Sequence, residues 1–90
     1  MTEEHLVKLE HENLEEELED VKKYLAMSKT ALELEDKRAS DGFLAIARDE
    51  FTHAEFLKMH LSSVNAHIDE RTLKAMSEVH HMLHNYLRRR

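Results

Sequence analysis

The chain has no cysteine, no proline and no tryptophan, and only one glycine among its 90 residues. Without cysteine it has neither a disulfide framework nor a thiolate metal site. A β-sheet needs turn residues between its strands, and a sequence almost free of glycine and proline offers few of them. Its five aromatic residues are Tyr24, Phe43, Phe51, Phe56 and Tyr86. These absences favour an all-α fold, because the residues that break helices are nearly missing.

An excess of basic residues is also lacking. The 13 Lys and Arg residues are outnumbered by 19 Asp and Glu residues, and the net charge of −6 argues against a nucleic-acid partner. The one basic cluster, Arg88–Arg90, ends the last expected helix, where cations complement the helix dipole. The sequence shows no signal peptide and no apolar run of membrane length, so we expect no membrane partner and a cytoplasmic protein.

The apolar residues that are present recur at three- and four-residue steps, which is the period of one helix face. They predict a single helical domain over residues 1–90, with helices at about 3–32, 36–64 and 69–87. The expected inward stripes are Leu6, Leu9, Leu14, Leu18, Val21, Leu25, Ser28 and Leu32; then Phe43, Ile46, Ala47, Ala54, Leu57 and Leu61; then Leu73, Met76, Val79, Leu83, Tyr86 and Leu87.

The first connection has two candidate positions. Ser40–Gly42 is the one obvious turn signal. In an antiparallel hairpin that bends there, Glu17 and Glu50 would miss each other by roughly 20 Å, since a helix rises about 1.5 Å per residue. A connection within 32–37 brings the two carboxylates level. We therefore predict the turn at 32–37, with Gly42 as a small contact residue inside the second helix.

Two ionisable residues interrupt the apolar stripe of the second helix. Glu50 and His53 lie one turn apart on that face, and a buried ionisable side chain is costly unless a partner or a metal compensates it. A carboxylate and an imidazole at this spacing form a chelating pair. The alternative is an intrahelical hydrogen bond at a partly exposed edge. On the first helix Glu17 lies on the inward stripe, seven residues before Tyr24, whereas the other acids there are expected to be mostly solvated.

A second pair at the same spacing, Glu78 and His81, lies off the stripe of its helix, and we expect it to be a surface pair. His60, one heptad beyond His53, is either a secondary ligand or a hydrogen-bonded core histidine, and we favour the latter. The remaining histidines are expected to be solvated or at a helix end: His5, His11, His67, His80 and His84. Of these, the last two have the four-residue spacing that can bind a transition metal adventitiously.

Glu17, Tyr24 and the stretch IARDEFTHA, with Glu50 and His53, resemble the ferritin-like di-iron carboxylate proteins, in particular the rubrerythrin-like and encapsulated-ferritin-like members. The resemblance covers about Leu14–Leu61, and EELEDVKKY and RDEFTHA are its most specific stretches. It implies an antiparallel helix hairpin plus a third helix. It also implies that Glu17, Glu50 and His53 are metal ligands that act in catalysis through the metal, with Glu50 bridging and Tyr24 beside the ligands.

Proteins of this family hold two irons between two half-sets of ligands, and this chain contains one half-set. A two-fold interface supplies each ligand twice, so the resemblance implies a homodimer or higher homo-oligomer that completes a four-helix bundle. It further implies two irons per dimer, with manganese or zinc as substitutes, and oxidation of ferrous iron by oxygen or peroxide in iron handling or peroxide defence. An encapsulin shell is a further candidate partner, although the end HNYLRRR shows no recognisable targeting tail.

Two other functions stay open. A metal-free helical module for oligomerisation or partner binding would use the long acidic helices as its surface, and Glu17 and Glu50 would then lie toward solvent. A hemerythrin-like or zinc-binding bundle is the third candidate, and the small number of inward histidines argues against the hemerythrin-like one.

Overall fold

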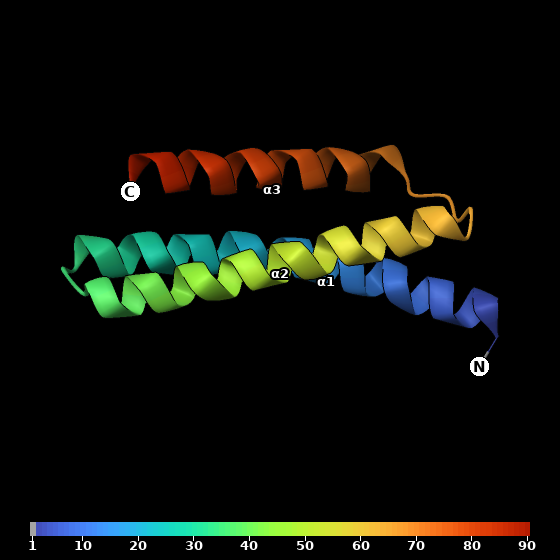
Figure 1. The fold of residues 1–90 in the computed structure, drawn as a ribbon, viewed down its shortest axis with the longest axis horizontal. Helices are drawn as coiled ribbons and strands as arrows, with labels where there is room; N and C mark the ends of the chain where they lie inside the picture. The colour runs from blue at the N-terminus through green and yellow to red at the C-terminus, as the bar shows by residue number, and fades with distance from the viewer. Residues whose placement is uncertain (1) are drawn as a thin grey trace.

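The computed structural model describes residues 2–90, which form three helices: α1 (Glu3–Glu33), α2 (Lys37–Ser63) and α3 (Glu70–Arg89). This part of the chain contains no strand, so the all-α prediction is confirmed. α1 and α2 form an antiparallel hairpin, and α3 runs along one side of it and returns the C-terminus toward the turn (Figure 1). None of the three helices is long and apolar enough to cross a membrane.

Each helix begins with a side chain that caps its free backbone N–H groups. The N–H of His5 donates to Thr2 Oγ1 at 3.1 Å, and the N–H of Ala39 donates to Asp36 Oδ1 at the same distance. The N–H of Thr72 donates to Asp69 Oδ1 at 2.7 Å. Such caps each contribute about 1 kcal/mol to helix stability.

The connection between α1 and α2 lies at residues 34–36, inside the range 32–37 expected from the sequence. It is tight because Glu35 adopts a left-handed conformation (φ 62°) and Asp36 N–H donates back to Ala31 O at 2.9 Å. α2 ends in the same way, with Asn65 at φ 57° and Ala66 N–H donating to Leu61 O. Glycine usually fills this position. Here two other residues accept the strain, so the chain turns without its one glycine.

Gly42 lies inside α2, as expected, but it is exposed and a Cβ built on it would meet no atom within 4 Å. The prediction that it contacts another part of the chain is therefore wrong, because its side of α2 faces away from α1.

The core is one continuous apolar cluster shared by the three helices. Its buried members are Leu14, Leu18, Val21, Leu25, Leu44, Ala47, Phe51, Ala54, Leu57, Leu61, Met76, Val79 and Leu83. Five residues expected in the inward stripes are instead exposed by about two fifths: Leu6, Leu9, Leu32, Ile46 and Leu73. The apolar pattern overestimates burial at these positions for two reasons. Each of the three helices is covered by the others on one side only, and residues near helix ends lack a neighbouring helix to pack against.

A polar cluster joins the three helices near the hairpin turn. Ser28 Oγ donates to Ser40 O, Ser40 Oγ donates to Ser28 O, and both distances are 2.8 Å. Tyr86 of α3 reaches Ser28 Oγ through its hydroxyl at 2.8 Å. Arg90 donates to Ser40 Oγ and also pairs with Asp41. The last arginine therefore binds the start of α2, a role that the expected dipole compensation by Arg88–Arg90 did not include.

Because this cluster fixes α3 to the hairpin, we expect Tyr86→Phe to lower the free energy of unfolding by about 1–2 kcal/mol, since it leaves a buried serine hydroxyl with one partner fewer. Urea unfolding measures this loss, and hydrogen exchange is expected to speed up most in α3. Tyr24→Phe is the control, because the ring of Tyr24 packs on Phe43 and its hydroxyl makes no hydrogen bond among residues 2–90. Equal losses in both variants would contradict the role of the cluster.

Candidate metal centre

The three predicted ligands meet across the hairpin. Glu17 of α1 and Glu50 and His53 of α2 each present one ligand atom, and these atoms lie within 4.8 Å of one another. No other group of three or more His, Asp or Glu side chains in residues 2–90 is arranged in this way. They meet because the turn at residues 34–36 brings Glu17 of α1 to the same height along the hairpin as Glu50 and His53 of α2.

The site has a buried floor and an exposed rim. The side chain of Glu17 is 13% exposed, and that of His53 is 59% exposed, with His53 Nδ1 3.6 Å from Glu17 Oε1. Glu50 is half-buried. Oε2 of Glu17 is buried and has no hydrogen-bond partner within the described chain. A buried carboxylate oxygen without a partner is costly, and a cation is one way to remove that cost.

Burial raises the pKa of Glu17 from 4.5 to about 7, and the neighbouring carboxyl group of Glu50 contributes to this rise through its proximity and its charge. His53 acts in the opposite direction but does not cancel the effect. No Lys or Arg of residues 2–90 forms an ion pair with Glu17 or Glu50. The two carboxylates therefore share a proton more readily than they share two negative charges.

The site lies on the side of the hairpin that α3 does not cover. α3 packs mainly on α1, where Thr72 and Ala75 line a cleft together with Leu18 and Lys22. The other side we call the open face. It is made of Glu10, Glu17, Tyr24 and Ala31, which follow at seven-residue steps on α1, and of Phe43, Ile46, Glu50, His53 and His60 on α2.

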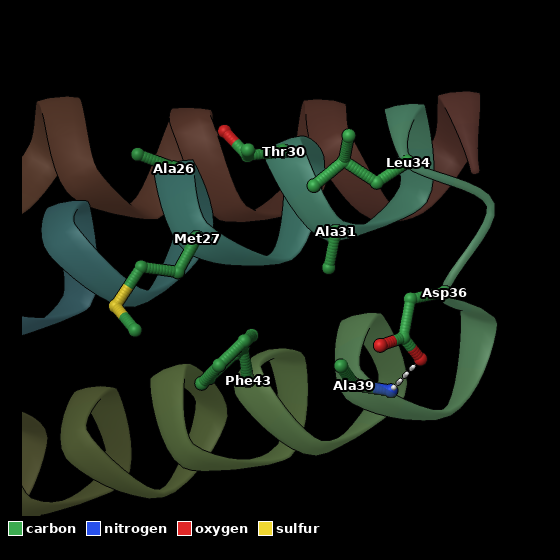
Figure 2. A pocket seen from close by; sticks show the side chains of 8 residues that line it. All are labelled: Ala26, Met27, Thr30, Ala31, Leu34, Asp36, Ala39 and Phe43. Atoms are coloured by element: carbon green, nitrogen blue, oxygen red, sulfur yellow. Dashed lines mark hydrogen bonds between the residues drawn. The ribbon is translucent and has the colours of Figure 1, made fainter.

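Toward the turn the open face is apolar and hollowed. A groove of ≈ 650 Å³ is lined by residues of the hairpin alone: Ala26, Met27, Thr30, Ala31, Leu34, Asp36, Ala39 and Phe43 (Figure 2). Met27 and Leu34 in it are 38% and 75% exposed. Tyr24 lies between this groove and the ligands, with its ring centroid 6.3 Å from that of Phe43. It is a neighbour of the site on the same stripe and not a member of the ligand group.

The histidines outside the site lie mostly at the surface. Glu78 and His81 are both exposed, as expected of a surface pair. His80 and His84 are exposed too, with ring centroids 4.3 Å apart.

Two residues of the open face were misjudged from the sequence. Glu10 was expected to be solvated with the other acids of α1, yet it is only 9% exposed. His60 was expected to be a hydrogen-bonded core histidine, yet its side chain is 36% exposed, and its Nδ1 contacts Glu10 Oε1 at 2.7 Å. The signal that identifies them is the seven-residue step, because Glu10 precedes Glu17 and His60 follows His53 by the same interval.

The donor set suits a hard or borderline divalent cation. Two carboxylates and one imidazole favour iron or manganese over metals that prefer thiolates, and the unpartnered Oε2 of Glu17 offers a free ligand atom. Three ligands from one chain leave coordination positions open for water, for an oxidant or for ligands of a second chain. No protein-family model matches the chain, and no curated protein or solved structure does so either. Function must therefore be inferred from the chemistry of these residues.

The raised pKa of Glu17 predicts how the stability of the metal-free protein changes with pH. Between pH 4.5 and about 7 the folded chain holds a proton that the unfolded chain releases. The stabilisation by this proton is complete below pH 4.5 and is lost as pH rises through about 7. Glu17→Gln keeps the hydrogen-bonding shape without the charge, so we expect it to stabilise the apo-protein at pH 8 by about 1–2 kcal/mol.

Urea unfolding from pH 5 to 8.5 with a chelator measures this effect. The curve of Glu17→Gln is expected to fall less steeply with pH than that of the wild type. Glu16→Gln is the matched control, because Glu16 is exposed on the same helix and should leave the slope unchanged. Identical slopes for the wild type and Glu17→Gln would contradict a shared proton at this site.

Proposed function

We propose that two copies of this chain pair through their open faces, and that the two sets of Glu17, Glu50 and His53 hold two irons at the interface. Ferrous iron bound there is oxidised to ferric iron, with oxygen or peroxide as the electron acceptor. The observation that carries the proposal is the convergence of two carboxylates and one imidazole, one of which, Glu17, has a buried oxygen without a hydrogen-bond partner. The ferritin-like resemblance of the same residues supports it.

The composition of the open face supports pairing with a second copy. Ile46, one turn before Glu50, is 38% exposed, and Met27 and Leu34 add apolar surface at the groove. Apolar residues left in solvent beside a polar site are typical of an interface between subunits. A two-fold axis at the site doubles the ligand set, which turns one half-set into the six-ligand arrangement typical of carboxylate di-iron bundles.

Each ligand has a definite task in such a site. The carboxylates of Glu17 and Glu50 would hold the cations and neutralise part of their charge, and by the ferritin-like resemblance Glu50 would be the carboxylate shared by both ions. His53, at the exposed rim, binds through a ring nitrogen and leaves room for the oxidant. The metal supplies redox chemistry when bound, while the buried floor of the site fixes ligand positions and keeps the proton of Glu17 available for release on binding.

The metal-free interaction module has less support. It requires Glu17 and Glu50 to lie toward solvent, and the side chain of Glu17 is 13% exposed. A hemerythrin-like site needs several inward histidines, and His53 is the one histidine in the ligand group.

Anaerobic titration of the apo-protein with ferrous iron, followed by oxygen, tests the proposal. We expect one tightly bound iron per chain and a near-ultraviolet absorbance of ferric iron after oxygen is added. Glu50→Ala should lose both, because it removes the candidate bridging carboxylate. Glu78→Ala, which alters the exposed pair at the same spacing, should retain both. Absence of stoichiometric binding, or equal binding by Glu50→Ala, would overturn the proposed function.

A charged substitution on the open face tests whether two copies of the chain pair through this face. Ile46→Lys should leave the chain helical but shift it to monomer in sedimentation, since a buried unpaired charge destabilises an interface by several kcal/mol. Leu73→Lys is the matched control, because Leu73 is equally exposed but lies on α3. Iron should increase the dimer fraction of the wild type by linkage. A dimer that survives Ile46→Lys and dissociates in Leu73→Lys would place the interface elsewhere.

A further inference from the structure

The open face carries a second carboxylate–imidazole pair. Glu10 and His60 lie one heptad from Glu17 and His53, and they are level across the hairpin in the same way, since 10 + 60 and 17 + 53 both equal 70. Seven residues of helix correspond to about 10 Å along the face. The pair therefore repeats the first site at a distance too great for one cation to be shared.

Glu10 is buried without full compensation. It is 9% exposed, and its Oε2 has no hydrogen-bond partner within residues 2–90. Leu14 and Leu57, one turn from Glu10 and His60 on their helices, are both buried. No Lys or Arg pairs with Glu10 in the described chain. A carboxylate held among leucines needs a charged partner.

His60 supplies that partner only in part. Its Nδ1 contacts Glu10 Oε1 at 2.7 Å without the geometry of a hydrogen bond, and Oε2 of Glu10 is left without a hydrogen-bond partner. Two ligand atoms bound to one cation at about 2.1 Å each lie roughly 3 Å apart, so a small separation of the two side chains opens the space for an ion. The rings of Phe56 and His60 lie nearly parallel, with their centroids 6.4 Å apart.

We propose that Glu10 and His60 form a second divalent-cation site on the open face, which takes a borderline transition ion such as Fe²⁺, Co²⁺ or Zn²⁺. The half-exposed His60 gives the ion access from solvent, and water completes the coordination. The position that corresponds to Glu50, the second carboxylate of the first site, is one heptad further along α2 in the second site, and Leu57 occupies it. With one carboxylate fewer, the second site should bind roughly tenfold or more weakly than the first. It depends neither on iron oxidation nor on pairing with a second copy.

Titration of the full-length apo-protein with Co²⁺, followed by visible absorbance and native mass spectrometry, tests this site. We expect two ions per chain in the wild type, and one ion in Glu10→Gln and in His60→Gln, with the weaker phase missing. His81→Gln is the matched control and should retain both ions. His84→Gln removes the exposed pair with His80, so any ion lost there belongs to α3 and is subtracted from the count.

Glu17→Gln separates this site from the proposed iron centre, because it should lose the tighter ion and keep the weaker one. If Glu10→Gln and His60→Gln both bind as many ions as the wild type, the pair is a structural contact only and the second site is excluded. Circular dichroism establishes that each variant is folded, and Glu10→Gln preserves the size of the side chain, so loss of an ion there cannot come from a cavity. Absence of Co²⁺ binding by the wild type would overturn the second site together with the first.

Discussion

The negative charge of Glu17 is the constraint on which the rest of this structure depends. Its carboxylate is nearly buried, and one of its oxygens has no hydrogen-bond partner; burial, together with the neighbouring Glu50, raises its pKa to about 7. A helical hairpin of this size has little stability to spare for such a group. The cost is explained if the carboxylates are placed to receive a cation, which replaces the shared proton.

The position of the site follows from local backbone chemistry. Glu35 accepts a left-handed conformation, which closes the hairpin at residues 34–36 and makes the two acidic positions level. The Ser28–Ser40–Tyr86 hydrogen bonds fix α3 on the opposite side. One side of the hairpin is thereby covered by α3 (Figure 1). The other side remains free, with the Glu17, Glu50 and His53 group, the apolar groove and the second Glu–His pair.

The helices, the turn and the grouping of Glu17, Glu50 and His53 could be predicted from the sequence. Apolar periodicity predicts the helices, and the condition that Glu17 and Glu50 lie opposite each other in an antiparallel pair predicts the position of the turn. Burial of individual residues could not. Periodicity alone does not tell which side of a hairpin a third helix covers, so Ile46 was expected inside and Glu10 outside. Nor does it show that Arg90 reaches Asp41 across the bundle, since their sequence positions are 49 residues apart. Binding of iron and pairing of two copies are chemical proposals that rest on the ligand group.

The most direct test is a crystal structure of the protein loaded anaerobically with ferrous iron, with anomalous scattering measured at the iron edge. We predict a pair of iron peaks related by a two-fold axis between two hairpins, bound by Glu17, Glu50 and His53 of both chains. Iron bound at other residues, or two chains that meet through α3 and leave these three side chains in solvent, would contradict the central claim.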